Sequence, residues 1–299
     1  MKPLAILTGD IHVRDDQPVC RTDDFFEAQA KKIAWLRHLQ QEHDCPILDS
    51  GDLFAKAKPS HFLIQWAILN LPAEMFTIPG NHDLPSHNLD LLDKSGLGVL
   101  RAAAAVQVLL RPFNVHSSLD VYPFPWGAEP SPLRRPSKSA QPRIALCHVM
   151  TYQGAEPWPG CKDSNSFELL KKMVGYDLVL TGHNHRPFVE EYDGRLLVNP
   201  GSLMRSNADQ IDFKPRVYLW YGGTDIEAVY VPIEKDVITR DHIDVVNDRD
   251  KRIDAFVSRL STDFEISLSF EKNLEEFFSA NRVRQGVKDI VWSAVKGEK

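Results

Sequence analysis

Short apolar runs alternate with longer, mixed segments over the first two thirds of the chain. Helices are expected between several of these runs: one from Asp24, whose carboxylate can cap it, a buried one over 61–70, and one over 167–174. Strands that alternate with helices are typical of an α/β fold. The runs that read as buried strands are 4–7, 45–48, 75–78, 106–110, 119–122, 144–147 and 178–180.

The pattern changes twice towards the C-terminus. Residues 188–192 and 195–198 flank Asp193-Gly194, a strong signal for a two-residue hairpin, and a second hairpin is expected over 216–231. After Pro232 the apolar residues recur at helical spacing. We therefore expect a core over 1–232 and a small, mostly helical capping or accessory unit over 233–299. Its apolar groups fall within 253–260, 270–278 and 287–294.

Composition narrows the class of protein without identifying it. The chain has 299 residues and is 43% hydrophobic, which supplies a sizeable core. No signal peptide and no membrane-spanning run is expected, and four widely spaced cysteines predict reduced thiols in a cytoplasmic protein. The net charge of −6 mildly opposes nucleic-acid binding, although a metal centre can neutralise phosphate locally.

Residues of metal-ligand type follow five of the apolar runs. In layered α/β folds, ligands gather beyond the carboxyl ends of the strands, so these distant residues are expected to converge. Oxygen and nitrogen donors without thiolate suit manganese, iron or zinc in a two-metal site. His82 is left over from this set. The candidate ligands are Asp10, His12, Asp52, Asn81, His148, His183 and His185.

Each of these pieces also has an ordinary structural interpretation. Asp10-x-His12 alone is usually a solvated loop, Gly51-Asp52 an ordinary turn, and His148 a satisfied core histidine. His183-x-His185 is the strongest single pair, because alternate side chains at a strand end reach the same face. Five such pieces in order favour a metal site over coincidence.

The complete set resembles the signature of calcineurin-like metallophosphoesterases over about residues 4–205. The resemblance rests on Asp10-x-His12, Gly51-Asp52, Gly80-Asn81-His82-Asp83, His148 and Gly182-His183-Asn184-His185. It implies a four-layer α/β/β/α sandwich with two divalent metals, manganese first, with iron, zinc or magnesium as alternatives. It further implies that Asp10, His12 and His185 hold one metal, that Asn81, His148 and His183 hold the other, and that Asp52 bridges them.

The resemblance also implies the chemistry of a hydrolase. Two metals lower the pKa of a shared water, and the resulting hydroxide attacks phosphorus in line. His82 would assist the leaving oxygen, with Asp83 placed to orient the imidazole. Asn81 offers a neutral oxygen, which limits the negative charge that an anionic substrate meets.

Two further stretches resemble the SbcD branch of DNA-repair nucleases: Gly51-Asp52-Leu53-Phe54 with Lys58-Pro59-Ser60, and Pro200-Gly201-Ser202. This resemblance implies a manganese-dependent DNA exo/endonuclease in repair or recombination, with DNA as substrate and an SbcC-type ATPase as partner. A stand-alone nuclease and a homodimer stay open. Candidate DNA-backbone contacts are Arg14, Lys56, Lys58, Arg186 and Arg205, together with Arg21 and the loop residues Arg134 and Arg135, and for each the alternative is a solvated surface charge.

Two other functions are compatible with the same fold and candidate metal site. A phosphoesterase acting on cyclic nucleotides, nucleotides or other small phosphate esters needs no DNA groove, and a non-enzymatic scaffold typically loses ligands, which this chain retains. Trp126 and Trp158 can stack on bases, but packing against the core is the favoured interpretation. A substrate panel separates the two enzymes, and metal analysis tests the scaffold.

Overall fold

The structure, a computed structural model, describes residues 1–133, 141–157, 161, 163–241, 243 and 270–296. Arg134, Arg135, Trp158 and the helix expected over 253–260 lie outside the described residues. The chain divides into two compact units, Met1–Thr239 and Arg240–Lys299, which we treat separately. Within the described parts, no helix is long and apolar enough to cross a membrane.

The first sheet has the strand order β14-β13-β1-β2-β3-β4. The strands β1 to β4 run parallel, and the hairpin β13–β14 adds two antiparallel strands at the β1 edge. The bounds are β1 Ala5–Thr8, β2 Ile47–Asp49, β3 Met75–Thr77, β4 Gln107–Val108, β13 Arg216–Gly222 and β14 Asp225–Tyr230.

The second sheet has the order β11-β12-β10-β7-β6-β5. Its four central strands are parallel, and its two edge strands are antiparallel. The bounds are β5 Phe113–Val115, β6 Leu119–Phe124, β7 Arg143–Cys147, β10 Leu178–Thr181, β11 Phe188–Tyr192 and β12 Arg195–Asn199, with a separate small pair β8 Thr151–Tyr152 and β9 Ser164–Asn165.

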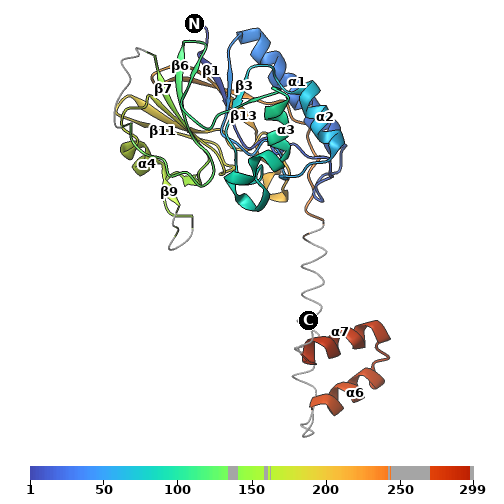
Figure 1. The fold of residues 1–299 in the computed structure, drawn as a ribbon. Coiled ribbons are helices and arrows are strands. Elements are labelled where there is room, and N and C mark those ends of the chain that lie inside the picture. The colour runs from blue at the N-terminus through green and yellow to red at the C-terminus, as the bar shows by residue number, and fades with distance from the viewer. Residues whose placement is uncertain (134–140, 158–160, 162, 242, 244–269, 297–299) are drawn as a thin grey trace. The chain divides into compact units, whose positions relative to one another are not determined.

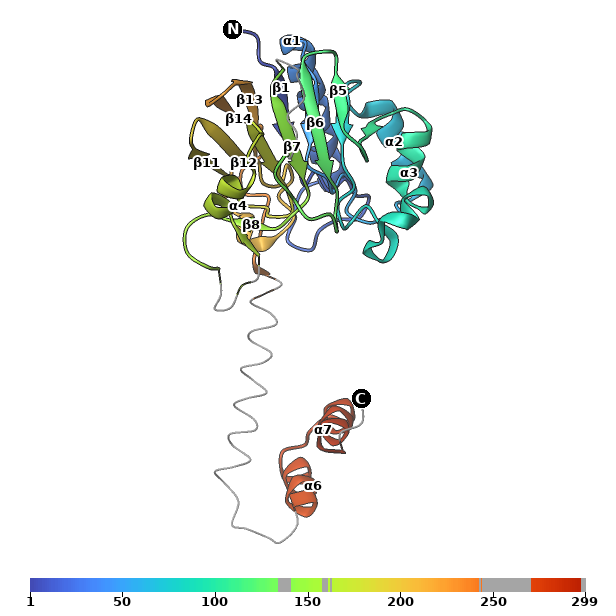
Figure 2. The ribbon, with the colours of Figure 1, turned by 60° about the vertical axis from the view of Figure 1, so that its left-hand side comes forward.

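Helices cover the outer face of each sheet (Figures 1 and 2). The first sheet is covered by α1, α2 and α3, and the second by α4. The bounds are α1 Phe25–His43, α2 His61–Asn70, α3 Gly96–Ala102 and α4 Ser166–Lys172, with the 3-10 turns η1 Pro85–His87, η2 Leu89–Lys94 and η3 Ala208–Gln210.

Three apolar cores separate these four layers. Alternate residues of a strand face opposite sides of a sheet, so Ile6 packs under the helices while Leu7 faces the second sheet. Leu7 shares its core with Ile144 of β7, and Ala145 on the other side of β7 packs under α4. The layers therefore run α, β, β, α, which confirms the predicted sandwich.

Several local predictions are confirmed. Asp24 caps α1, its side chain accepting from the backbone N–H of Glu27 at 2.9 Å. Asp193 and Gly194 join β11 to β12 with positive φ values of 52° and 69°, as a tight hairpin turn requires. The second hairpin is equally close to its expected bounds.

Two local predictions are wrong, and one strand was missed. The helix α2 is not buried: only Leu63 and Ala67 are fully covered, while Phe62 and Leu69 are 58% and 68% exposed. The strand β5 was not expected. Pro123 was expected to end the strand over 119–122, but it lies inside β6, where it is tolerated because the pairing of β6 with β5 stops at Val121.

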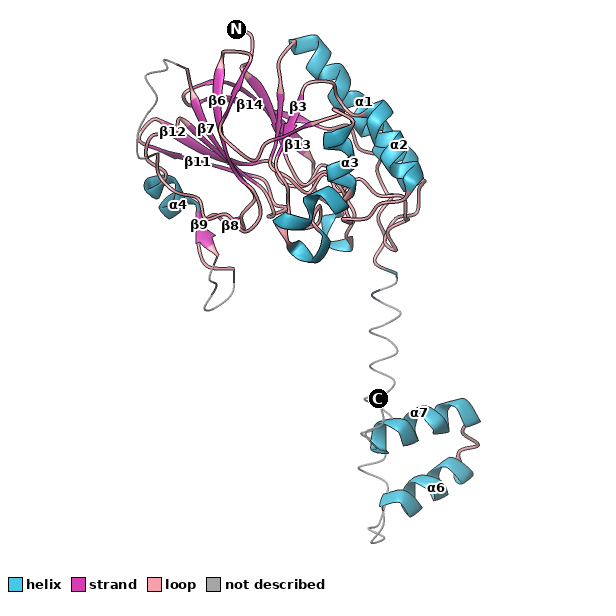
Figure 3. Ribbon diagram, in the orientation of Figure 1, coloured by secondary structure: helices cyan, strands magenta, loops and turns pink. Residues whose placement is uncertain are grey.

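The described part of the C-terminal unit is a pair of helices, α6 Phe270–Ala280 and α7 Gln285–Lys296, as Figure 3 shows by secondary structure. Leu274 and Phe278 are buried, and the ring of Phe278 lies 6.3 Å from that of Trp292. The expected helical character is confirmed for these residues. The role of the unit as a cap stays a prediction.

Candidate metal centre

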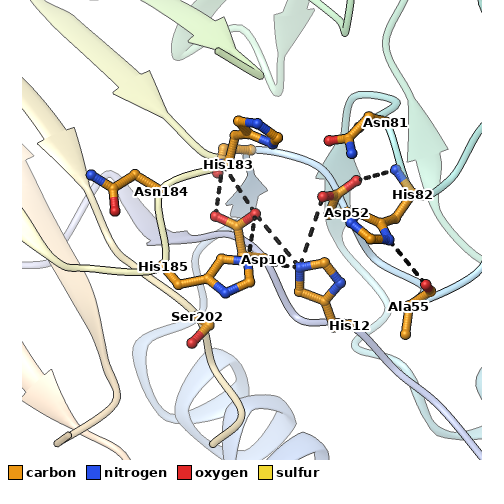
Figure 4. Close-up of polar contacts among 12 residues, drawn as sticks. Asp10, His12, Asp52, Ala55, Asn81, His82, His183, Asn184, His185 and Ser202 are labelled. Atoms are coloured by element: carbon orange, nitrogen blue, oxygen red, sulfur yellow. Dashed lines mark hydrogen bonds and ion pairs between the residues drawn. The ribbon is translucent and has the colours of Figure 1, made fainter. Parts of the chain in front are cut away.

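The loops that follow five strands meet at one edge of the sandwich (Figure 4). Three of these strands, β1, β2 and β3, belong to the first sheet, and β7 and β10 belong to the second. Each predicted ligand therefore stands where sequence reasoning placed it, beyond the carboxyl end of a parallel strand. These ligands are Asp10, His12, Asp52, Asn81, His148, His183 and His185, of which Figure 4 labels all except His148.

Four of these residues have left-handed backbone conformations. The φ values are 48° for Asp10, 51° for His12, 56° for Asp52 and 75° for His183. Such a conformation is uncommon for residues with a Cβ atom and costs roughly 1–3 kcal/mol where it is strained. Its concentration at one edge indicates that the loops are shaped to aim these side chains.

Two glycines allow the loops to approach one another. A Cβ atom on Gly80 would lie 2.1 Å from Oδ1 of Asp52. Gly51 has a φ of 100°, and a Cβ there would lie 2.8 Å from Nδ1 of His148. Any side chain at either position would displace a candidate ligand, so both positions require glycine.

Asp10, His12 and His185 form the first group of candidate ligands. The Nε2 atoms of the two imidazoles lie 3.0 Å apart, and each lies 3.9 Å from Oδ1 of Asp10. Such separations are typical of atoms that share an ion at roughly 2.1 Å. The two oxygens of Asp10 also accept the backbone N–H of His183, at 3.0 and 2.9 Å, which fixes the carboxylate.

Asp52, His148 and His183 form the second group. Oδ2 of Asp52 lies 3.4 Å from Nε2 of His148, and Oδ1 of Asn81 lies 3.0 Å from the same nitrogen. Nδ1 of His148 bonds the carbonyl of Ser50 at 2.7 Å. Because that bond occupies Nδ1, Nε2 is the nitrogen that faces the other donors, and it can bind a metal once its proton is displaced.

Asp52 lies within reach of both groups. Its Oδ2 is 3.8 Å from Nε2 of His12, as well as close to His148. A carboxylate so placed can bridge two ions. The residues present therefore fit the dinuclear metal site that the sequence predicted, with His and Asp donors and the amide oxygen of Asn81.

Burial shapes the ionisation of these ligands. Burial lowers the pKa of His12 to about 3 and that of His183 to about 4, so both imidazoles are neutral and able to bind a metal. Burial, together with the charge of Asp52, raises the pKa of Asp10 to about 7. Burial opposes the charged form of His148, but the hydrogen bond and charge of Asp52 outweigh it and raise the pKa to about 9.

The neighbouring residues His82 and Asp83 differ from expectation. The imidazole of His82 is exposed, and its Nδ1 bonds the carbonyl of Ala55 at 3.1 Å. The buried carboxylate of Asp83 instead accepts three backbone N–H groups, those of Leu53, Phe54 and Gly80, at 3.0–3.3 Å. Direct orientation of the imidazole by Asp83 is therefore wrong: Asp83 orders the loop, and the carbonyl of Ala55 contacts the ring.

The five main predicted DNA contacts fall into three classes. Lys56, Lys58 and Arg186 are exposed. Arg14 lies beside the site, but its guanidinium pairs with Asp16, and Lys56 also lies 3.4 Å from that carboxylate. Arg205 is 4% exposed and donates to two backbone carbonyls, so burial contradicts the prediction that it contacts a DNA backbone.

Two cavities open beside the candidate ligands. One, of about 220 Å³, is lined by Asp10, His12, Arg14 and His82, among others. The second, of about 550 Å³, is lined by His148 and Trp126. The Trp126 ring lies 5.1 Å from that of His183 and packs against the core, so the favoured packing interpretation is confirmed, while stacking on a base stays a prediction.

Sequence reasoning missed the residues that hold the ligand loops. Asn199 donates to the carbonyls of Asn184 and Arg186 at 2.6 and 2.7 Å, and Asn184 donates to the carbonyl of Thr151. The carbonyls of Ser50 and Ala55 were also missed. A polar residue at the end of β12 was a signal for Asn199, whereas any residue supplies a carbonyl.

Several solved structures are similar to this chain over about three quarters of its length. The chain is 15% identical to the protein TT1561 of Thermus thermophilus (TM-score 0.47; 78% of this chain and 100% of that one). It is 15% identical to a putative 5′-nucleotidase from Staphylococcus aureus (TM-score 0.46; 79% of this chain), of whose length it spans 56%. It is 16% identical to the phosphopantetheinyl hydrolase of Mycobacterium tuberculosis (TM-score 0.43; 76% and 96%).

No curated protein sequence matches the chain significantly. The family defined by the calcineurin-like phosphoesterase superfamily domain matches residues 5–214, the segment that contains both groups of candidate ligands. The chain therefore belongs to the calcineurin-like phosphoesterase superfamily and is a metal-dependent hydrolase of phosphoesters.

Proposed function

We propose that this chain is a manganese-dependent DNA exo/endonuclease of the SbcD type that acts in repair or recombination. The observation that carries the proposal is the pair of cavities on two sides of the metal centre. A phosphate within a polynucleotide chain has substituents on both sides, whereas a phosphate monoester needs room on only one.

The roles of the residues follow from their positions. Asp10, His12 and His185 would hold one metal, Asn81, His148 and His183 the other, and Asp52 would bridge them. The two ions supply a nucleophile at neutral pH and neutralise phosphate oxygens.

His82 is exposed at the mouth of the site, where its imidazole can donate a proton to the leaving oxygen. Trp126 offers an aromatic face to a base in the larger cavity. Lys56, Lys58 and Arg186 lie exposed in or next to ligand loops, where they can attract a DNA backbone.

The test is a gel assay with single-stranded, duplex and hairpin DNA over a manganese titration. We expect degradation that requires manganese and that is lost in His82→Ala. Intact DNA in the presence of a protein with two bound metals would overturn the proposal.

A phosphoesterase acting on small esters is the second candidate, and the charge distribution favours it. The net charge is −6, and the carboxylate of Asp16 already forms ion pairs with Arg14 and Lys56. A panel of cyclic nucleotides, mononucleotides and a nitrophenyl phosphodiester, compared with DNA by kcat/KM, separates the two: preference for the small esters supports this candidate.

An SbcC-type ATPase is the proposed partner if the chain acts in a complex. Support comes from α6 and α7, whose Phe270, Ile290 and Val287 are 58%, 62% and 46% exposed. Exposed apolar side chains on a helix pair are typical of a protein-binding surface. Co-purification with such an ATPase, lost in Ile290→Asp, tests this; a homodimer and a cytoplasmic location also stay predictions.

A further inference from the structure

A third cavity lies away from the metal ligands, against α1. Its volume is about 110 Å³, and it is lined by residues of α1, by Arg21 and Arg205, and by residues 232–234. Its cationic lining is Arg21, Lys31, Lys32 and Arg205. Of these, Lys31 is exposed, while Arg21, Lys32 and Arg205 are buried, with exposed fractions of 7%, 6% and 4%.

These three cations lack a matching number of carboxylates. Arg21 pairs with Asp23, Nε to Oδ1 at 2.8 Å. The Nζ atom of Lys32 instead donates to the carbonyl of Leu203 at 3.2 Å, and Arg205 donates to carbonyls. Among the ion pairs of the described residues, none includes Lys32 or Arg205.

The donors of these two residues are also incompletely used. Lys32 has three N–H donors, and one bond is accounted for by Leu203. The Nε–H of Arg205 is buried and has no hydrogen-bond partner among the residues that the structure describes. A buried charge with unused donors is strongly unfavourable unless an anion meets it.

The ionisation of Lys32 agrees with this arrangement. Burial, reinforced by the charges of Arg21 and Arg205, lowers the pKa of Lys32 to about 7, and Asp23 only partly opposes the shift. Lys31 and Glu234 at the rim are exposed. A guanidinium stays protonated at all working pH values, so Arg205 keeps its positive charge in any case.

We propose that this cavity binds a phosphate-sized oxyanion, with Lys32 and Arg205 as its donors. The cavity volume is several times the volume of about 10–15 Å³ that one water molecule needs, so an oxyanion fits. Charge-assisted hydrogen bonds from a guanidinium and an ammonium are the usual means of holding phosphate. The ligand is inorganic phosphate or the phosphate of a mononucleotide.

The experiment counts phosphate sites on the metal-loaded full chain by titration calorimetry. We expect two inorganic phosphates per chain, one at the metal centre and one in the cavity. Lys32→Met removes the charge at nearly constant length and should leave one site, or weaken the second at least about tenfold. Lys32→Arg should retain both sites. Lys94→Met, a change at an exposed lysine, should also retain both.

One phosphate per wild-type chain, or two on Lys32→Met with unchanged affinity, would overturn the proposal. Thermal melting of Lys32→Met shows whether the variant is folded, and Lys32→Arg keeps the test decisive if it is not. A parallel titration with a 5′-mononucleotide identifies the source of the anion: tighter binding than inorganic phosphate at the second site assigns the nucleotide, and weaker binding assigns free phosphate. The proposal is independent of the substrate at the metal centre.

Discussion

Asn81 and His82 are adjacent residues that present different groups to the metal centre. Oδ1 of Asn81 lies 3.0 Å from a ligand nitrogen, while His82 is exposed and bonds Ala55. We expect Asn81→Ala to lower metal occupancy, and His82→Ala to keep both metals while kcat falls about 10²–10⁴-fold, the usual contribution of general acid catalysis. Elemental analysis and steady-state kinetics on a phosphodiester measure the two effects.

The outcome that would contradict this assignment is a role for His82 as a metal ligand. A ring nitrogen of His82 lies close enough to ligand atoms of His12 and Asp52 for the three to share one ion. Loss of one metal from His82→Ala would show that it is a ligand and would contradict the assigned role.

Asp83 has a structural role that can be measured. Its carboxylate accepts three buried N–H groups, and each unsatisfied donor costs about 1–3 kcal/mol. Asp83→Ala should therefore lower the free energy of unfolding by about 3 kcal/mol or more. Asp83→Asn, which keeps one carbonyl oxygen, should cost less. Urea denaturation of the metal-free proteins measures both, and a loss under about 1 kcal/mol for Asp83→Ala contradicts the account.

Lys32 should make stability depend on pH. Burial lowers its pKa from 10.5 to about 7, so between these values the folded chain binds fewer protons than the unfolded chain, and stability rises with pH. At or below pH 7, the free-energy penalty of burying the charged Lys32 side chain is fully present. Lys32→Met should therefore stabilise the protein most at pH 7, and the gain should shrink towards pH 10, by about 1.4 kcal/mol per unit of pKa shift at most.

Urea denaturation of both proteins at pH 7 and 9.5, in buffers without phosphate, gives this difference. Comparison with the variant removes the effect of the cysteine thiols, which titrate in the same range. A difference that stays constant with pH would show that Lys32 is not buried as described.

The sequence predicted the ligand residues because their identity and position are both encoded locally. A carboxylate or an imidazole directly after an apolar run is visible without coordinates, as Asp52 and His148 show. The partners of His148 and His82 are backbone carbonyls of Ser50 and Ala55, which any residue type offers. The direction in which Arg205 points depends on tertiary packing, so its predicted role was wrong.

The helix α2 shows that element type and element burial are separate questions. Leu63 is 1% exposed and Leu69 is 68% exposed on the same helix. We expect Leu63→Ala to cost about 2–5 kcal/mol and Leu69→Ala less than about 0.5 kcal/mol. Thermal or urea denaturation of these two variants measures the two losses of stability. Equal costs would mean that another surface covers Leu69.

Composition explains why α2 was misjudged. Its residues are apolar nearly all round, and such a helix is expected to be buried on all sides. Only one face meets the core here. The strand β5 was missed for the opposite reason: its Phe113 and Asn114 are exposed at a sheet edge, so the apolar signal is weak.

At the scale of the molecule, the layers were predictable and the pairing of distant strands was not. Strand and helix alternation fixes a layered α/β arrangement, but β1 pairs with β13 more than two hundred residues later, a contact that no local pattern indicates. All three apolar cores lie within the first compact unit, Met1–Thr239. This leads to a prediction about truncation.

A chain of residues 1–239 contains all seven candidate ligands and all three cores of the sandwich. We expect it to fold, to bind the same number of metals as the full chain, and to hydrolyse a nitrophenyl phosphodiester with kcat/KM within about threefold of it. Metal analysis and kinetics check this. Insolubility or loss of metal would show that the C-terminal unit is required for the centre.

Residues 202–206 form a backbone shared by two cavities. Ser202, Met204 and Ser206 line the cavity beside the metal ligands, while the carbonyl of Leu203 and the side chain of Arg205 serve the cationic cavity. A ligand in one cavity couples to the other only if it moves this shared segment. Thermodynamic linkage makes this reciprocal: if phosphate in the cationic cavity changes substrate affinity by some factor, substrate changes phosphate affinity by the same factor. Phosphate that is released by the reaction and bound in the cationic cavity would then change the substrate affinity of the metal centre.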